Sequence, residues 1–600
     1  MSSGIMQKVN TSLRLAQLRE LMRRNNVTTY IVPPDDSHAS EYVADCFNRS
    51  AYISGFSGGS GWAAISEEGA ALTTDGRYLK QVARQLDGNW TLFDDGWEDW
   101  LAEKCKDGKS AAVDPTLMSP AVAEELTEII QKAGGSGLVA VTDNLVDKIW
   151  GDEQPPPPTC SVFIHPDKYA GKSVKAKLAE LRDVILKNDA SGMYITMLDE
   201  VAWLFNLRGS DVRYNPVFYS YAFVATDKAV LYVDALKVDE SVNKHLAVNN
   251  VSVKPYDSFY GDVDQATEGK YLITNKAPWA LRAAFRGDRA VEVGAIAQAK
   301  SIKNAVELQG MRACHIRDGA ALTSYSAWLE HQLIVENTTI TEAEAADKLL
   351  ALRKKQPLFV GNSFETISCT GSNAAITHYH ARHGTSSVID PNAVYFCDSG
   401  GQYYDGTTDT TRTFHFGTPS DQEKEAYTRV LKGLIALHRA VFPRGVTGHA
   451  LNVLAKQFLW NVGLNFRHGT GHGVGSFLNV HEGPMGIGSR PSFMKHPLRP
   501  GNVLSNEPGC YQDGSFGIRI ENIMIVVEVR TKNCSSTPFY GFENVTMVPY
   551  CRNLIDSSFL SPEEKDWINA RNAETLEKTQ DVVANDEVAL AWLKRNTEPL

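Results

Sequence analysis

Hydrophobic and polar residues follow the same order in two separate stretches of the chain. Leu15–Glu20 (LAQLRE) and Leu178–Asp183 (LAELRD) each begin an amphipathic helical pattern, which runs into a short β-like segment, TTYIV or GMYIT. Further along, YISGF near Tyr52 matches WLFNL near Trp203, and AALTTDGRYL matches AVLYVDALKV. An internal repeat of this kind predicts two related α/β domains. The alternative is a chance recurrence of helix–strand order.

Two breaks in the pattern divide the chain into three parts. Pro155–Pro158 are four consecutive prolines, which cannot join a helix or the interior of a sheet. A second break falls near residue 305, where a long helical pattern begins with AVELQGMRACHIRDGAALTSYSAWLEHQL. We therefore predict three domains, at residues 1–154, 155–305 and 306–600.

The third part alternates between β-like and helical patterns. The β-like runs are AVYFCDSG, TTRTFHFG, NVLSNEPG and FGIRIENIMIVV, and the helical runs include DQEKEAYTRVLKGLIALHRAVF. This alternation favours an α+β domain with antiparallel strands. Ser561-Pro562-Glu563-Glu564 supplies a helix N-cap, a first-turn proline and a capping-box glutamate, so the sequence predicts closing helices.

Composition narrows the class of protein. The 600 residues are 43% hydrophobic and 22% charged, as in ordinary folded proteins, and the net charge of -11 argues against a general nucleic-acid or anionic-membrane binder. Neither a leader segment nor a run of membrane-spanning length is evident, so we expect a cytoplasmic protein. Nine scattered cysteines without a C-x-x-C pair indicate neither a disulfide framework nor a zinc finger.

Two short motifs imitate catalytic signatures. Gly55–Gly59 (GFSGG) fits the G-x-S-x-G nucleophile elbow, but the residues that follow alternate like strands, so a glycine-rich hairpin is the better interpretation. His468–His472 (HGTGH) has the histidine spacing of a metalloprotease helix. It lacks the glutamate of that motif, and its glycines disfavour a helix.

Acidic residues stand where apolar strands should continue. Asp398 interrupts VYFCDSG, and Asp409 follows eleven residues later across a glycine pair that can turn a hairpin. Two carboxylates brought so close repel each other unless cations neutralise them. Glu521 lies in FGIRIENIMIVV, which reads as one strand with Arg519 and Glu521 on the same face, and a charge inside so apolar a strand is costly without a partner.

Two further residues complete a candidate metal site. Glu507 ends a predicted strand at a proline, and His472 lies among glycines that let backbone approach a ligand closely. Any one of these residues alone is more often a solvated turn residue than a ligand. Oxygen-rich ligation with one imidazole and no thiolate suits manganese, cobalt or zinc, and the excess of oxygen favours Mn²⁺ over Zn²⁺ or Co²⁺.

The five residues and their flanking motifs resemble one known family. Asp398, Asp409, His472, Glu507 and Glu521 occur in CDSGGQYYDGTTDTTRTF, RHGTGHGVGSFLNVHEGP, NEPGCY and GIRIEN. Their order and spacing resemble the creatinase/aminopeptidase P family, and the resemblance covers essentially the whole chain. It implies two related creatinase-like α/β domains followed by a pita-bread metallopeptidase catalytic domain with a helical tail.

The resemblance also implies roles for individual residues. Asp409 and Glu521 would bridge two divalent cations, Asp398 would hold one of them, and His472 with Glu507 would hold the other. The remaining residues of the expected site are catalytic or substrate-binding: His378, His468, His481, Arg519 and Arg77. Of these, His378 and His481 would hydrogen-bond the substrate, whereas Arg519 would orient a ligand carboxylate, bind substrate or balance charge. An exposed turn arginine is the competing interpretation of Arg77.

By resemblance, the expected activity is hydrolysis of the bond between an N-terminal residue and a penultimate proline. Glu507 would act as the general base for a water activated by the two metals. The implied partners are proline-containing peptides and a second copy of the chain in a homodimer. The alternatives are a prolidase acting on Xaa-Pro dipeptides, a methionine aminopeptidase, and a non-catalytic peptide-binding module on the same fold.

Overall fold

A computed structural model describes residues 8–600, apart from 75–77, 267, 286, 378 and 534–535. The chain forms two compact units. The first unit comprises Met1–Ile164, Ser173–Arg213 and Val217–Ala295, and the second comprises His165–Lys172, Tyr214–Pro216 and Ile296–Leu600.

The first unit contains two six-stranded sheets with one topology. Their strand orders are β4-β3-β2-β1-β5-β6 and β12-β11-β10-β8-β13-β14. In the first sheet β1 pairs antiparallel with β2 and parallel with β5. In the second sheet β8 pairs in the same way, antiparallel with β10 and parallel with β13. The strands are β1 (Thr29–Val32), β2 (Trp62–Ser66), β3 (Ala70–Thr73), β4 (Trp90–Phe93), β5 (Ser110–Val113) and β6 (Gly137–Ala140), then β8 (Gly192–Ile195), β10 (Ser220–Ala225), β11 (Ala229–Val233), β12 (Val251–Lys254), β13 (Tyr271–Thr274) and β14 (Ala290–Val293).

This shared topology confirms the two related α/β domains that the repeat predicted. LAQLRE lies in α1 (Ser12–Arg24) and LAELRD lies in α8 (Val174–Lys187), each directly before the first strand of its sheet. The boundaries at 154/155 and 305/306 stay predictions. The GFSGG segment connects α2 (Arg49–Ser54) to β2, so Ser57 follows a helix and precedes a strand, the reverse of a nucleophile elbow.

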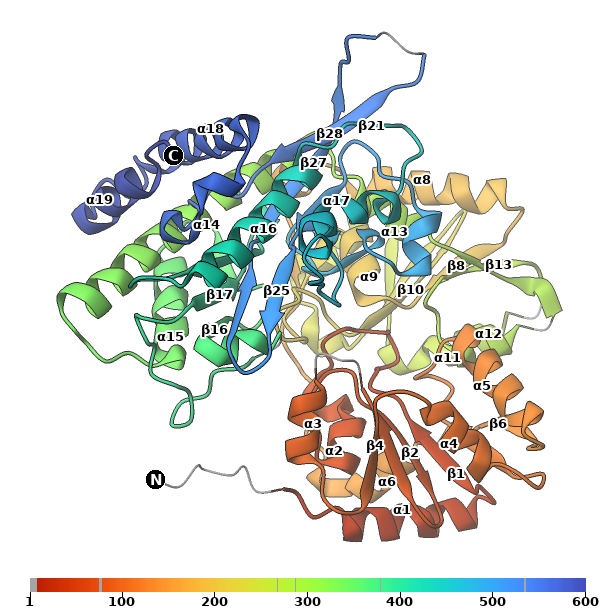
Figure 1. Ribbon diagram of the computed structural model, residues 1–600. Helices are drawn as coiled ribbons and strands as arrows, with labels where there is room; N and C mark the ends of the chain where they lie inside the picture. The colour runs from red at the N-terminus through yellow and green to blue at the C-terminus, as the bar shows by residue number, and fades with distance from the viewer. Residues whose placement is uncertain (1–7, 75–77, 267, 286, 378, 534–535) are drawn as a thin grey trace. The chain divides into compact units, whose positions relative to one another are not determined.

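Helices cover both faces of the first sheet (Figure 1). Buried side chains of α1, α2, α3 (Leu79–Gln85) and α6 (Leu145–Trp150) pack on one face. Those of α4 (Trp97–Lys104) and α5 (Pro120–Lys132) pack on the other. The helices after α8 in the second sheet's half of the unit are α9 (Leu198–Leu204), α10 (Glu240–Val248), α11 (Phe259–Asp264) and α12 (Trp279–Ala284).

The strands of the second unit pair antiparallel, as the patterns predicted. One sheet has the order β16-β17-β20, and a larger one has the order β21-β28-β27-β24-β22-β23. The strands are β15 (Phe359–Asn362), β16 (Ile367–Thr370), β17 (Tyr395–Ser399), β18 (Gly401–Tyr403), β19 (Gly406–Thr407), β20 (Thr410–Phe414), β21 (Phe442–Pro443), β22 (Gly471–Gly473), β23 (Glu482–Ile487), β24 (Val503–Asn506), β25 (Gly509–Gln512), β26 (Phe516–Arg519), β27 (Asn522–Val529) and β28 (Phe539–Asn544).

Helices pack around these strands, and buried side chains of each helix join one hydrophobic core with strands β17, β20, β25 and β26. The helices are α14 (Ala305–Glu330), α15 (Glu342–Arg353), α16 (Asp421–His438), α17 (Gly448–Trp460), α18 (Pro562–Thr579) and α19 (Glu587–Asn596). Asn304 and Glu307 form a capping box at the start of α14, and Ser561 and Glu564 form the predicted one at the start of α18. These caps satisfy backbone N–H groups that the first helical turn leaves without partners.

The segment FGIRIENIMIVV differs from its prediction as one strand. It forms β26 and β27, which belong to different sheets and join at Ile520–Glu521. The backbone N–H of Ile520 donates to the carbonyl of Pro508, whereas that of Glu521 donates to the carbonyl of Thr411. Glu521 therefore lies at a crossing between two sheets.

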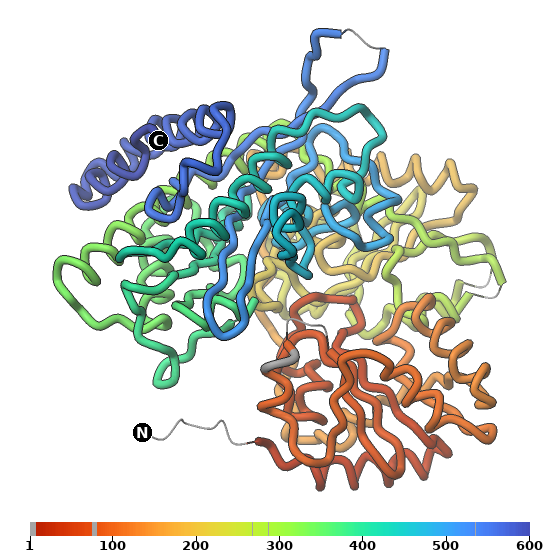
Figure 2. The backbone as a smooth tube through the Cα atoms, in the orientation of Figure 1, coloured from red at the N-terminus to blue at the C-terminus, as the bar shows by residue number. Residues whose placement is uncertain are grey.

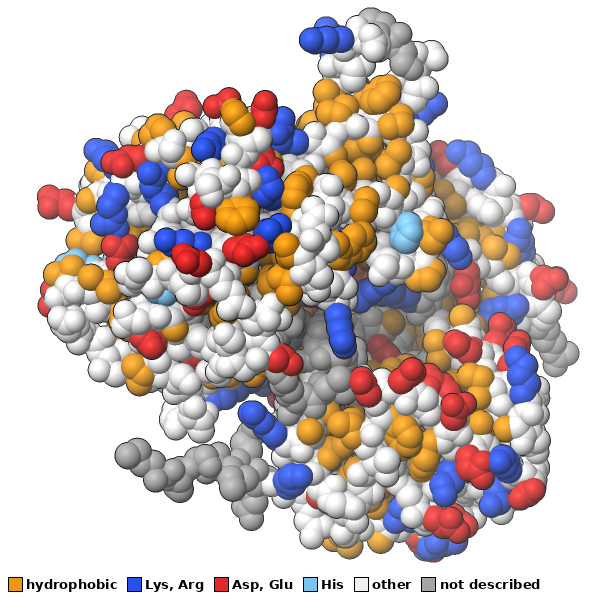
Figure 3. Space-filling model, viewed as in Figure 1, with side chains coloured by type: hydrophobic (Ala, Val, Ile, Leu, Met, Phe, Trp, Pro, Cys, Tyr) orange, Lys and Arg blue, Asp and Glu red, His pale blue; other side chains and the backbone are white. Residues whose placement is uncertain are grey.

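Strands β27 and β28 continue into a long hairpin that projects from the second unit (Figure 2). On the face drawn in Figure 3, hydrophobic side chains gather over β21, β27 and β28, and the neighbouring Val441 is 51% exposed. Among the described residues, every helix is too short or too polar to cross a membrane.

Candidate metal centre

Asp398 and Asp409 approach each other through a chain reversal. Strand β17 pairs with β20 so that Asp398 lies opposite Thr411, and the hairpin β18–β19 forms the connection between them. Asp409 lies directly before β20. Oxygen atoms of Asp398, Asp409 and Glu521 all lie within 4.8 Å of one another, and all three residues are buried. The chain reversal predicted from the glycine pair is therefore present, with the tight turn at Tyr404–Asp405.

His472 and Glu507 come from neighbouring strands of the larger sheet. His472 lies in the centre of β22, and Glu507 follows β24, which pairs with it. Nε2 of His472 is 3.5 Å from Oε1 of Glu507 and 3.4 Å from Oδ2 of Asp409. His472, Glu507 and Glu521 each place one ligand atom within 4.8 Å of the others. The structure thus brings together all five residues that the sequence predicted as metal ligands.

The glycines beside His472 make room for neighbouring strands. A Cβ at Gly471 would lie 2.1 Å from the carbonyl oxygen of Ser505, and one at Gly473 would lie 2.3 Å from that of Glu482. Side chains at either position would push β22 away from its neighbours. We expected these glycines to let backbone approach a ligand, but the close approach in the structure is between strands.

One tautomer of His472 follows from its backbone contact. Nδ1 is 2.9 Å from the carbonyl oxygen of Gly473, so this nitrogen carries the hydrogen and donates it. Nε2 is then left facing the carboxylates. This is the arrangement in which a histidine presents a lone pair to a metal ion.

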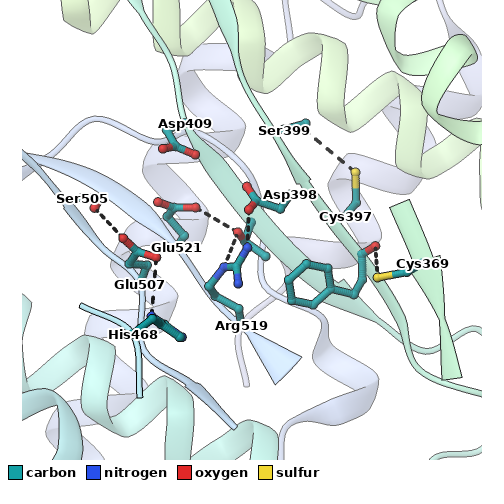
Figure 4. A network of polar contacts seen from close by, with 12 residues as sticks. Cys369, Cys397, Asp398, Ser399, Asp409, His468, Ser505, Glu507, Arg519 and Glu521 are labelled. Carbon is teal, nitrogen blue, oxygen red and sulfur yellow. Dashed lines mark hydrogen bonds and ion pairs between the residues drawn. The ribbon is translucent and has the colours of Figure 1, made fainter. Parts of the chain in front are cut away.

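Figure 4 shows the carboxylates of Asp398, Asp409, Glu507 and Glu521 around one small space. Burial raises the pKa of Asp398 to about 6; Arg519 opposes this shift and Asp409 adds to it. Burial, and then the charges of Asp409 and Glu507, raise the pKa of Glu521 well above its usual value. The repulsion anticipated between neighbouring carboxylates is therefore present in the folded chain.

His472 responds in the opposite sense to its acidic surroundings. Burial lowers its pKa, but the hydrogen bond with Asp409 and the charge of Glu507 outweigh burial and raise the pKa to about 9. In the cation-free cluster at neutral pH, the imidazole therefore carries a second proton, on Nε2, and is positively charged. A metal ion bound at Nε2 would displace that proton.

Two oxygen atoms of the cluster are suited to cations. Oδ1 of Asp398 and Oε1 of Glu521 are buried and have no hydrogen-bond donor among the described residues. Buried carboxylate oxygens normally have a donor or a cation, because leaving water is costly. The donor set of four carboxylates and one imidazole also matches divalent metals that prefer oxygen. The residues therefore fit the predicted pair of divalent cations.

Arg519 holds one carboxylate of the cluster in place. Its Nη2 donates to Oδ2 of Asp398, its Nε donates to Oγ1 of Thr411 at 3.1 Å, and its Nη1 donates to Tyr511 at 2.9 Å. All three guanidinium nitrogens are thus engaged by neighbouring side chains. Among the interpretations of Arg519, this geometry favours the orientation of a ligand carboxylate over contact with substrate.

A chain of hydrogen bonds continues from Arg519 to His468. The Tyr511 hydroxyl lies 2.8 Å from Nε2 of His468, and Nδ1 of His468 lies 2.8 Å from the carbonyl oxygen of Gly469. Burial lowers the pKa of His468 to about 4, so the imidazole is neutral at neutral pH. Nδ1 then donates to Gly469, and Nε2 accepts the hydrogen of the Tyr511 hydroxyl.

His481 lies at the open side of the cluster. It is exposed, its ring centroid is 4.3 Å from that of His472, and one of its nitrogens lies within 4.8 Å of ligand atoms of Asp409 and His472. The structure therefore brings His468 and His481 to the five acidic and histidine residues. The other two expected residues, His378 and Arg77, lie outside the described residues.

Sequence reasoning missed the residues that orient the ligands. Thr411 donates to Oε2 of Glu521 at 2.8 Å. Ser505 donates to Oε1 of Glu507 at 3.2 Å and accepts the backbone N–H of His472. Thr411 and Tyr511 lie within motifs quoted for the resemblance, and Ser505 directly precedes one. Nothing in the sequence distinguishes them from other hydroxyl residues.

Comparisons with known proteins agree with this geometry. A model described as metallopeptidase family M24 matches residues 309–528, and one of the C-terminal region of peptidase M24 matches residues 538–600. Models of the creatinase/prolidase N-terminal domain match residues 14–149 and 153–307. The matches cover both α/β sheets and the strands that carry the cluster.

Similar proteins match along the whole chain. Two fungal proteins named probable Xaa-Pro aminopeptidase P are 55% and 54% identical. The protein of Botryotinia fuckeliana covers 99% of this chain and 94% of its own length, and that of Fusarium vanettenii covers 99% of both. The crystal structure of an X-prolyl aminopeptidase from Caenorhabditis elegans, described as a cytosolic enzyme with a di-nuclear active site, has a TM-score of 0.94 and 35% identity. It covers 99% of this chain and 100% of its own. The chain therefore belongs to metallopeptidase family M24, within the aminopeptidase P group that its motifs resembled.

Proposed function

We propose that this protein is a metal-dependent aminopeptidase that hydrolyses the bond between an N-terminal residue and a penultimate proline. The observation that carries the proposal is the cluster of four carboxylates and one imidazole, in which two buried carboxylate oxygens have no donor among the described residues. The names of the full-length relatives support the proline preference.

Five residues would hold two divalent cations, for which we propose Mn²⁺ in preference to Zn²⁺ or Co²⁺. Asp409 and Glu521 would bridge the pair, Asp398 would hold one ion, and His472 with Glu507 would hold the other. Bound cations of this kind activate water and polarise the scissile carbonyl. The di-nuclear site of the C. elegans relative supports a pair over a single ion.

The protein's own residues would supply proton transfer and orientation. Glu507 is the proposed general base, since Ser505 and His472 hold one of its oxygens while the other lies 3.8 Å from Nδ1 of His468. The neutral His468 accepts a hydrogen bond from Tyr511. Tyr511 in turn is held by Arg519, which also contacts Asp398. His481, exposed beside His472, would hydrogen-bond the substrate, and His378 and Arg77 keep their proposed substrate contacts.

Two other functions remain as alternatives within the proposal. A prolidase would use the same ligands, but the full-length relatives share all three predicted parts of this chain and are named for aminopeptidase activity. A non-catalytic module is disfavoured because no ligand of the set is replaced. We also propose that the protein is cytoplasmic and forms a homodimer. Sedimentation of the purified protein would show whether its mass is that of two chains.

Peptide length and the position of proline test the proposed activity. With Mn²⁺ restored after chelation, an Xaa-Pro-Xaa tripeptide and longer peptides with proline second should release their first residue. The same peptides with alanine second should remain intact. Product release can be followed by liquid chromatography. Cleavage without a second-position proline would refute the specificity, and turnover confined to Xaa-Pro dipeptides would favour the prolidase.

Substitution Asp398→Asn tests the ligand assignment. Loss of residues that merely orient metal ligands costs about 10- to 100-fold, so loss of a ligand should lower kcat by at least about 100-fold. The fold should survive, because Arg519 keeps Tyr511 and Thr411 as partners. Circular dichroism would monitor folding. The control is Asp566→Asn on the exposed side of α18, which should leave kcat unchanged; near-normal turnover by the Asp398 variant would contradict the assignment.

The pKa shifts predict how cation binding depends on pH. The pKa of Asp398 rises to about 6 from 3.8, so the stability that this group contributes to the cation-free fold is present below pH 3.8 and lost as pH rises through about 6. Protons and cations compete for Asp398, Glu521 and His472. Mn²⁺ affinity should therefore fall at least about ten-fold from pH 7.5 to 5, and Mn²⁺ should raise the melting temperature more at pH 7.5.

Calorimetric titration at the two pH values would measure this affinity. At pH 7.5 the titration should also detect proton release, since His472, with a pKa of about 9, loses its proton on binding. Repetition in buffers of different ionisation enthalpy would count the protons. An affinity that does not change between pH 5 and 7.5 would contradict the proposed competition.

A further inference from the structure

Two lysines share one buried glutamate in the second unit. Lys300 lies in α13 (Ala295–Ser301), Lys303 lies between α13 and α14, and Glu482 begins β23. Nζ of Lys300 is 2.8 Å from Oε2 of Glu482, and Nζ of Lys303 contacts Oε1. All three side chains are at most 3% exposed. Each carboxylate oxygen is therefore held by its own ammonium group.

This arrangement is costly for a purely structural contact. Three ionised groups have left water, and two of them carry the same sign. Burial lowers the pKa of Lys303, and Lys300 lowers it further, while the contact with Glu482 and the charge of Glu307 oppose both. A hydrophobic cluster of similar volume would commonly stabilise a fold as well or better. A carboxylate held at both oxygens, however, cannot rotate, so the contact fixes the position of β23.

Glu482 stands at the point where the pairing of β22 and β23 is irregular. His472 pairs with Gly486, whereas the next residue, Gly473, pairs with Glu482. Three residues of β23 therefore bulge out between these two pairs. The carbonyl oxygen of Glu482 is so close to Gly473 that a Cβ there would lie 2.3 Å from it. The side chain of Glu482 is thus anchored where its backbone abuts the strand of His472.

His481 directly precedes this anchored residue. The chain from Glu482 can place the His481 ring 4.3 Å from that of His472 only while β23 keeps its register. A shift of about 1 Å in a residue that positions substrate can cost about 100-fold in rate. The two lysines lie outside the metal-ligand cluster, but the glutamate that they hold is the sequence neighbour of His481.

We propose that Lys300 and Lys303 are positioning residues that act through Glu482 to hold His481 against His472. The proposal rests on the proposed function, in which His481 hydrogen-bonds the substrate. The competing role is purely structural: the lysines would only attach the segment before α14 to the sheet. The two roles differ in whether the lysines act through His481.

A double-mutant cycle separates the two roles. Lys303→Met keeps the side-chain volume and leaves the contact between Lys300 and Glu482 in place, so the fold should persist. We expect kcat/KM on an Xaa-Pro-Xaa peptide to fall about 10- to 100-fold, with Mn²⁺ content unchanged because the five ligands are intact. In a His481→Ala background, Lys303→Met should lower kcat/KM by less than about two-fold. An equal loss in both backgrounds, or no loss in the first, would overturn the proposal.

The first unit offers a matched control for lost stability. Lys237 and Asp211 form a buried pair at 2.6 Å, with side chains 5% and 0% exposed. Lys237→Met removes the lysine paired with Asp211, so it should destabilise the chain at least as much as Lys303→Met, yet leave kcat/KM unchanged. If both variants lose activity in proportion to their melting temperatures, stability explains the loss and the proposal fails.

A crystal structure tests the inference independently of turnover. In the Mn²⁺-loaded Lys303→Met protein, the separation of the His472 and His481 rings should exceed that of the wild type by about 1 Å or more. An unchanged separation would overturn the positioning role whatever the peptide assay shows. A wild-type protein inactive on every proline peptide would instead refute the proposed function, while this ring separation would still decide the role of the lysines.

Discussion

Mutual repulsion among four clustered carboxylates, three of them buried and that of Glu507 partly buried, is the constraint on which the second unit depends. Asp398, Asp409, Glu507 and Glu521 converge from four different strand ends on a space only a few ångströms across. Burial raises the pKa of Asp398 and of Glu521, and the charges of the neighbouring carboxylates raise both further. Cations relieve the repulsion. The cluster therefore joins stability to metal binding, because the groups that weaken the cation-free fold are those that would bind the ions.

The surrounding structure keeps these charges in place. Thr411 and Ser505 each donate to a carboxylate of the cluster, and Arg519 contacts Asp398 while Tyr511 holds Arg519. Arg412 is fully buried, and its guanidinium donates to the backbone carbonyl of Glu521. This hydrogen bond fixes the backbone where β26 passes into β27. Rigid strands with satisfied neighbours hold ligands more accurately than loops do. In the same way, the contacts of Lys300 and Lys303 with Glu482 would hold the neighbouring His481 in position.

The sequence predicted the parts of the site that chemistry makes conspicuous. Asp398 and Glu521 were identified because a charge within an apolar strand has no cheap structural explanation, and the repeat was identified because LAQLRE and LAELRD precede equivalent strands. The break at Ile520–Glu521 was missed, since it depends on backbone hydrogen bonds to Pro508 and Thr411, which are remote in sequence. Ser505, Tyr511 and Lys303 carry no local signal, because their roles arise only from tertiary contacts. The proline preference came from resemblance and not from any residue pattern.

Anomalous diffraction from Mn²⁺-loaded crystals tests the central claim most directly. The account predicts two peaks per chain, one against Asp398 and one against His472 and Glu507, with Asp409 and Glu521 between them. Such a result would explain why oxygens of Asp398 and Glu521 are buried without donors among the described residues. A single peak, or peaks away from these five residues, would contradict a two-cation centre.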